Sequence, residues 1–203
     1  MKRRTLLSAG GAAAALGGGV AAGLAAGAWP RPSAAGTTGI PDLPVIDQDG
    51  NRYRFYTDLV KGRVVTFNFF FSSCGPTCPL VTQNLLHVQE LLGPRVGRDI
   101  FMYSITLWPE VDTPEFLRAY ADQYGIGRGW RLLTGMPHHI ERLRRRLGFA
   151  RFDPELDRII EDHTGMLRYG NEALDRWGAA PALSRPEWIV KAISTALLED
   201  AVA

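Results

Sequence analysis

The chain is poor in cysteine and shows no excess of charge of either sign. Only two of its 203 residues are cysteines, Cys74 and Cys78, and these lie too close together to staple a fold. Basic residues number 23 and acidic residues 21, so the sequence predicts no strongly basic surface for nucleic acid. Internal repeats are also lacking. A single domain whose cysteine pair has a chemical role is therefore the first expectation.

The N-terminus has the pattern of an exported leader. Lys2, Arg3 and Arg4 precede a stretch rich in Ala and Gly that carries no charge before Arg31. The paired arginines and the weakly apolar middle resemble a Tat signal. We therefore expect an export signal over residues 1–28.

The sequence predicts three parts, which are the leader, a linker and a folded domain. Ala26-Gly27-Ala28 offers a small-residue cleavage site, and the alternative is a membrane anchor through residues 5–28. A linker rich in Pro, Gly and Ala is predicted over residues 29–41, followed by a folded domain over residues 42–203. Either outcome places the domain in the periplasm or at the outer face of the cytoplasmic membrane.

Strand-like and helix-like segments alternate along the predicted domain. An N-terminal hairpin with a turn at 48–51 leads to an apolar run over 64–71, which is expected to be a central strand. Alternation of this kind predicts an α/β fold with a mainly parallel sheet and helices on both faces. The later segments are strands at 100–107, 130–133 and 164–169 and helices ending at 92, opening at 113 and 137, and spanning 185–198.

The two cysteines occupy the turn between the central strand and the next helix, in Ser-Ser-Cys-Gly-Pro-Thr-Cys-Pro. Thiols at a helix N-terminus gain thiolate character from the helix dipole. In an oxidising compartment such a pair either cycles as a disulfide or is protected by a metal. Disulfide exchange and a soft metal both remain open at this point.

The order of several segments resembles the Sco/SenC family. These segments are Cys74-x-x-x-Cys78-Pro79 after an apolar strand, Ser104-Ile105-Thr106 followed by Asp112-Thr113-Pro114-Glu115, Trp130 to Gly135, and Asp162-His163-Thr164. The resemblance implies a thioredoxin-like fold and a copper-binding protein that helps to assemble the copper site of cytochrome oxidase. It also implies that Cys74, Cys78 and His163 are copper ligands.

The implied ligand set suits copper(I), a soft ion that prefers thiolates and imidazole at low coordination number. Two departures from the family pattern stand out. Gly75-Pro76 follows the first cysteine where the family usually has Pro and Asp, and residues 170–178 are expected to replace the family's usual strand, turn and strand. Both departures allow for a client other than the usual oxidase.

Two functions follow from the cysteine pair. The first is a copper(I) metallochaperone, a binding module without turnover, whose partners are a copper donor and a cuproprotein such as a cytochrome oxidase subunit. The alternative is a thiol-disulfide oxidoreductase without a metal, with Cys74 and Cys78 as the redox pair. Three residues between the cysteines, in place of the usual two, count against a general oxidoreductase. A thiol peroxidase is disfavoured because no local set of a supporting Arg or Gln together with a Trp appears around either cysteine in sequence.

The remaining candidate ligands have simpler explanations. His87, His138 and His139 are expected to lie on helix surfaces, although His138 and His139 could form a surface metal site. Met102 and Met166 are expected to pack in the core. Phe116, Tyr120 and Trp188 are expected on the core-facing stripes of their helices. An arginine cluster at 142 and 144–146 predicts the solvated face of a helix.

Overall fold

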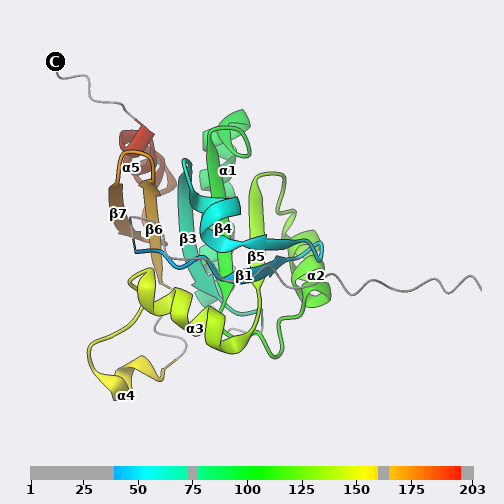
Figure 1. The fold of residues 1–203 in the computed structure, drawn as a ribbon. Helices are drawn as coiled ribbons and strands as arrows, with labels where there is room; N and C mark the ends of the chain where they lie inside the picture. Colours follow the sequence, from blue (N-terminus) through cyan, green and yellow to red (C-terminus); the bar gives the residue numbers. More distant parts are fainter. Residues whose placement is uncertain (1–38, 73–76, 160–164, 198–203) are drawn as a thin grey trace, which may run out of the picture.

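The computed structural model describes residues 39–72, 77–159 and 165–197. One seven-stranded sheet with the order β2-β1-β5-β4-β3-β6-β7 organises this part of the chain (Figure 1). The strands are β1 (Pro44–Asp47), β2 (Arg52–Arg54), β3 (Val64–Phe70), β4 (Ile100–Thr106), β5 (Trp130–Thr134), β6 (Met166–Asn171) and β7 (Arg176–Pro181). The expected thioredoxin-like α/β fold, including the N-terminal hairpin β1–β2, is confirmed.

The sheet is mixed, so the prediction of a mainly parallel sheet was wrong in that detail. Parallel pairing is confined to β3 with β4 and β4 with β5. The other four pairings, between β1 and β2, β1 and β5, β3 and β6, and β6 and β7, are antiparallel. Two of these four pairings are hairpins, because short turns join β1 to β2 and β6 to β7 and a short connection reverses the chain direction.

Helical segments cover both faces of the sheet. They are η1 (Phe55–Val60, a π-helix), α1 (Thr77–Leu92), η2 (Gly93–Arg95, a 3-10 helix), α2 (Pro114–Tyr124), α3 (Pro137–Arg146), α4 (Pro154–Asp157) and α5 (Pro186–Leu197). Apolar residues of α1, α2 and α5 form one core with the sheet, and those of η1 and α3 form a second core on the opposite face. All seven residues of β3 are buried, as expected for a central strand.

Local signals in the sequence set several element ends correctly. Thr113 caps α2 by accepting a hydrogen bond from the Phe116 backbone N–H, Pro114 takes the first helical position, and Gly125 ends the helix in the left-handed conformation. Pro137 opens α3 in the same way. These positions follow from side-chain size and backbone chemistry alone.

The C-terminal part differs from expectation at one important point. Residues 170–178 were expected to replace the family's strand, turn and strand, but β6 and β7 form a six-pair antiparallel ladder around a turn at 172–175. Asp175 adopts φ 48° in that turn, a left-handed conformation that Asp tolerates better than most residues. The hairpin is therefore retained in this chain.

The hairpin is anchored by a buried acid in its turn. Glu172 accepts hydrogen bonds from the Tyr56 hydroxyl and the Gly62 backbone N–H, each at 2.6 Å. The Glu172 backbone N–H donates to the Arg63 carbonyl at 3.0 Å. These contacts tie β6–β7 to the segment that leads into β3.

The predicted burial of four side chains was wrong. Arg144 was expected in solvent but is only 5% exposed, because it forms a bidentate ion pair with Asp157, with Nη1–Oδ1 at 2.7 Å and Nη2–Oδ2 at 2.8 Å. Phe116, Met166 and Trp188 were expected in the core and are 57%, 41% and 65% exposed. Apolar spacing alone does not tell which part of a helix or strand its neighbours cover.

Candidate metal and thiol site

Of the three predicted copper ligands, the structure places one. Cys78 is the second residue of α1 and is 1% exposed. Cys74 and His163 lie outside the described residues, so the structure neither joins nor separates the predicted set. The site is therefore built from the described residues on either side of these two positions.

The segments that flank Cys74 and His163 belong to neighbouring strands. β3 and β6 are antiparallel, and Asn68 pairs with Leu167. The C-terminal end of β3, from which the cysteine turn departs, therefore lies beside the N-terminal start of β6, which follows His163 in the sequence (Figure 1). Tertiary structure brings together two chain regions that are far apart in sequence.

The start of the cysteine turn is held by a buried carboxyl group. Asp112 is fully buried and accepts hydrogen bonds from the Ser72 backbone N–H at 3.1 Å, from the Ser72 hydroxyl and from the Thr106 hydroxyl. Thr106 in turn accepts a hydrogen bond from the Trp108 backbone N–H at 2.9 Å. Asp112 thus fixes the end of β3 to the loop between β4 and α2.

Cys78 enters the apolar core between α1, α2 and the sheet. Thr82, one helical turn after Cys78, shares a hydrogen bond of 2.7 Å with the Tyr120 hydroxyl, and either oxygen can donate. Burial raises the pKa of Tyr120, and the nearby Cys78 adds a smaller contribution in the same direction. Tyr120 is therefore a neutral phenol that keeps its proton beside the thiol.

Aromatic rings shield this end of the sheet from water. Phe70 packs on Tyr120 with ring centroids 5.3 Å apart, and Phe71 meets Trp108 edge to face at 6.3 Å. Phe70 and Phe71 are buried, whereas Trp108 is 42% exposed and lies at the rim. Low local polarity of this kind strengthens electrostatic and metal-ligand interactions.

Sequence reasoning missed the roles of Asp112 and Tyr120. Asp112 was predicted only as part of the segment Asp112-Thr113-Pro114-Glu115, and Tyr120 only as a member of a core-facing stripe. The sequence signal for Asp112 is weak, because an acid after a buried strand is equally common in a solvated loop. Its burial depends on Ser72, 40 residues away in the chain.

The other candidate metal ligands do not gather around Cys78. His87 is exposed on α1, and Met102 is buried as expected. His138 and His139 lie side by side at the start of α3 with ring centroids 4.2 Å apart. Burial and the neighbouring His138 lower the pKa of His139. In the part of the chain that the structure describes, no three His, Cys, Asp or Glu side chains are grouped to hold a metal.

Comparisons with known proteins point to one family. A family model described as SCO1/SenC matches residues 37–183. One relative is a protein of Stutzerimonas stutzeri whose name describes it as a proposed copper-binding protein. It is 31% identical over 109 residues, which make up 54% of this chain and 52% of the relative. The chain thus spans about half the length of this curated relative.

Solved structures share the fold. Yeast Sco1 with copper bound is similar with a TM-score of 0.61 and 19% identity, over 78% of this chain and 92% of that structure. BsSco, described as having a disulfide switch and as a member of the Sco family of cytochrome c oxidase assembly proteins, has a TM-score of 0.62 and 23% identity, over 79% and 94%. At these identities the similarity shows the fold alone.

Proposed function

Because this chain belongs to the SCO1/SenC family, we propose that it is an exported copper(I)-binding metallochaperone. Cys74, Cys78 and His163 would hold the ion, and the client would be a cuproprotein such as a subunit of cytochrome oxidase. The observation that supports the proposal is the pairing of β3 with β6, because the end of β3 leads toward Cys74 and the start of β6 follows His163 in the sequence.

The donor chemistry fits a soft ion as cargo. Thiolates and a neutral imidazole are ligands that copper(I) accepts at low coordination number. Cys78 lies in the first turn of α1 within a core that excludes water, and no acidic residue occupies that turn. Ligand exchange with a client then needs only that a competing thiolate or imidazole displace one donor at a time.

Export is part of the proposal and rests on the sequence. Residues 1–28 would direct translocation, residues 29–41 would form the linker, and residues 42–203 the folded domain. Within the described ranges, none of the helices is both long and apolar enough to cross a bilayer. Retention of residues 5–28 would anchor the domain at the outer face of the cytoplasmic membrane, and cleavage after Ala28 would release it into the periplasm.

A copper(I) titration tests the ligand set. The reduced protein competes with a chromophoric copper(I) chelator, and we expect one equivalent to be retained. His163→Ala and Cys74→Ser should each lower copper(I) affinity by at least about tenfold. His87→Ala is the matched control, because His87 is an exposed histidine on α1 and its loss should change nothing. Unchanged affinity in His163→Ala would refute the ligand set.

A thiol-disulfide oxidoreductase is the second candidate, and the position of Cys78, four residues after Cys74 and in the first turn of α1, supports it because a helix N-terminus favours the thiolate. One thiolate would attack a client disulfide and release a client thiolate. The other thiolate would attack the mixed disulfide and release the second client thiolate, which leaves Cys74 and Cys78 oxidised. Disulfide reduction in a metal-free assay that survives His163→Ala but not Cys74→Ser would favour this function over copper transfer.

A further inference from the structure

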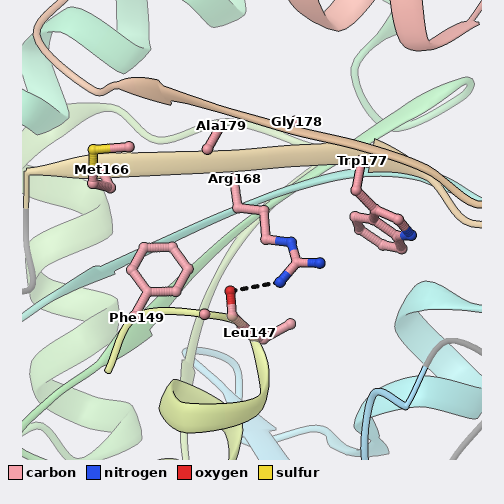
Figure 2. Close-up of a pocket in the computed structure, with 8 residues that line it drawn as sticks. Leu147, Phe149, Met166, Arg168, Trp177, Gly178 and Ala179 are labelled. Carbon is pink, nitrogen blue, oxygen red and sulfur yellow. Dashed lines mark hydrogen bonds between the residues drawn. The ribbon is translucent and has the colours of Figure 1, made fainter. Parts of the chain in front are cut away.

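A cavity lies between the C-terminal end of α3 and the β6–β7 hairpin, and the copper proposal makes no use of it. Its volume is about 360 Å³, which lies within the range of small-ligand sites. Figure 2 shows the apolar walls, formed by Phe149, Met166, Trp177 and Ala179. Met166 lines the cavity and is 41% exposed, so the cavity communicates with solvent.

The apolar residues that line this cavity are joined by one cationic side chain, Arg168. Arg168 extends from β6 into the space between Phe149 and Trp177 (Figure 2). Its Nη1 donates to the Leu147 carbonyl at 2.7 Å, and the guanidinium carbon lies 5.0 Å from the centroid of the Trp177 ring. Burial lowers the pKa of Arg168, which is the mark of a charge that has lost part of its water.

Among the described residues, the contacts of Arg168 use only a small part of its hydrogen-bonding capacity. A guanidinium carries five N–H donors in a rigid fork that matches a carboxylate. Over residues 39–72, 77–159 and 165–197, no carboxylate forms an ion pair with Arg168. The buried Arg144, by contrast, is fully engaged by Asp157 and Glu141. Arg168 is held in place by a carbonyl and a ring, neither of which neutralises its charge.

We propose that this cavity, the Arg168 pocket, binds the carboxylate of a ligand whose body is apolar. The carboxylate would pair with the Arg168 fork, and the apolar body would lie against Phe149, Met166 and Trp177. Such a group can come from a small organic acid or from an acidic side chain beside an apolar one on a partner protein. This inference does not depend on the copper proposal.

The lining of the pocket supports an apolar acid over a simple anion. The walls present aromatic and thioether surface, which gains little from an inorganic ion and much from hydrocarbon. Gly148, which also lines the cavity, leaves room for the guanidinium, because an added Cβ would lie 3.4 Å from the Arg168 Nη1. Its positive φ of 81° disfavours a side chain there, and so the approach of the guanidinium to the Leu147 carbonyl stays open.

The test uses the full chain and follows the Trp177 indole N–H resonance in a nitrogen-15 spectrum. The indole signal is assigned by its absence in Trp177→Phe. One arm adds 3-phenylpropionate, and the second adds the blocked dipeptide N-acetyl-Phe-Glu-amide. Their neutral counterparts, 3-phenylpropionamide and N-acetyl-Phe-Gln-amide, are the ligand controls. We expect saturable shifts with a dissociation constant on the order of millimolar for the acids, as fits probes of this size.

Three variants distinguish ligand binding in the Arg168 pocket from a general effect of substitution on the fold. Arg168→Gln should weaken binding by at least about tenfold, since a charge-assisted hydrogen bond is lost. Ala179→Leu keeps Arg168 but fills the pocket and should have the same effect, which protects the test if Arg168→Gln folds poorly. Arg63→Gln is the matched control, because the Arg63 guanidinium lies 4.7 Å over the Phe101 ring elsewhere in the fold.

The outcomes distinguish the two sources and can overturn the proposal. Binding of the free acid alone identifies a small-molecule site, and binding of the dipeptide with at least comparable affinity identifies a docking site for an acidic segment. Equal binding of acids and amides, or unchanged binding in Arg168→Gln, overturns the proposal. It is also overturned if a Glu161→Gln, Asp162→Asn double variant binds the acids more than about tenfold more tightly, because the chain then supplies the carboxylate itself.

Discussion

Asp112 offers the sharpest test of how the fold controls the cysteine turn. Its buried carboxyl accepts hydrogen bonds from the Ser72 N–H and hydroxyl and from the Thr106 hydroxyl. Ser72 precedes Cys74 closely in the sequence, so the contact fixes the backbone where the turn begins. Asp112→Ala removes all three contacts and leaves the Ser72 and Thr106 donors without their acceptor, and Thr106 is fully buried.

The expected loss of stability follows from these contacts. Each hydrogen bond to a buried carboxyl group contributes about 1 to 2 kcal/mol, and stranded donors add a desolvation cost. Asp112→Ala should therefore lower the free energy of unfolding by about 3 to 5 kcal/mol. Urea denaturation followed by circular dichroism measures this difference.

A matched control separates stability from the chemistry of the turn. Asp42 is also buried, and it accepts hydrogen bonds from the Thr57 backbone N–H at 2.8 Å and the Thr57 hydroxyl at 2.7 Å. Asp42→Ala should lower the free energy of unfolding by a similar amount, yet Asp42 contacts Thr57 and Arg54, which belong to the N-terminal part of the domain and not to the described ends of the cysteine turn. The two variants therefore compare a similar loss of stability at the cysteine turn and away from it.

The assays are copper(I) affinity and the reduction potential of the Cys74–Cys78 pair, both measured under conditions where the variants stay folded. We expect Asp112→Ala to weaken copper(I) binding by about tenfold and to shift the potential, because the turn loses its fixed geometry. Asp42→Ala should leave both unchanged. Equal effects of the two variants on both readouts, or no effect of Asp112→Ala, would refute the positioning role.

Three further predictions concern the scaffold. Glu172→Ala should lower the free energy of unfolding by about 2 to 4 kcal/mol in urea denaturation, since the Tyr56 hydroxyl loses a buried acceptor; a loss no larger than that of Tyr56→Phe would contradict the anchoring role. Hydrogen bonding to Arg144 lowers the pKa of Asp157, so its contribution is present above the unfolded pKa of about 3.9 and declines as the pH falls below it. The stability gap between wild type and Asp157→Asn should therefore narrow from pH 7 to pH 3, and a constant gap would refute the pairing. Gly170→Ala should destabilise the protein by about 1 to 3 kcal/mol in thermal unfolding, because its Cβ would overlap an indole ring, and a neutral effect would show that the ring moves aside.

Much of the local structure could be predicted from the sequence because its causes are local. The β1–β2 hairpin follows from its turn residues, and α2 begins where Thr113 caps it and Pro114 fits the first turn. The burial of β3 follows from a run of apolar residues too long for a half-exposed strand. Each of these features needs only neighbours within a few residues.

The reactive pair was also visible in the sequence, since Cys74 and Cys78 are the only cysteines and flank the start of a helix. The resemblance to the Sco/SenC family then added His163. The departure expected at 170–178 was wrong, because the ladder between β6 and β7 depends on backbone pairing, which residue types only weakly indicate.

The sequence by itself determined which residues can do chemistry and where the chain alternates between strand and helix, since both depend on residue type and short spacing. Tertiary structure alone decided which distant groups meet. It paired β3 with β6, buried Asp112 against Ser72, buried Arg144 against Asp157 and left Arg168 beside Trp177 in an open cavity. The physical reason is that burial and pairing are set by the packing of whole elements, which local spacing does not encode.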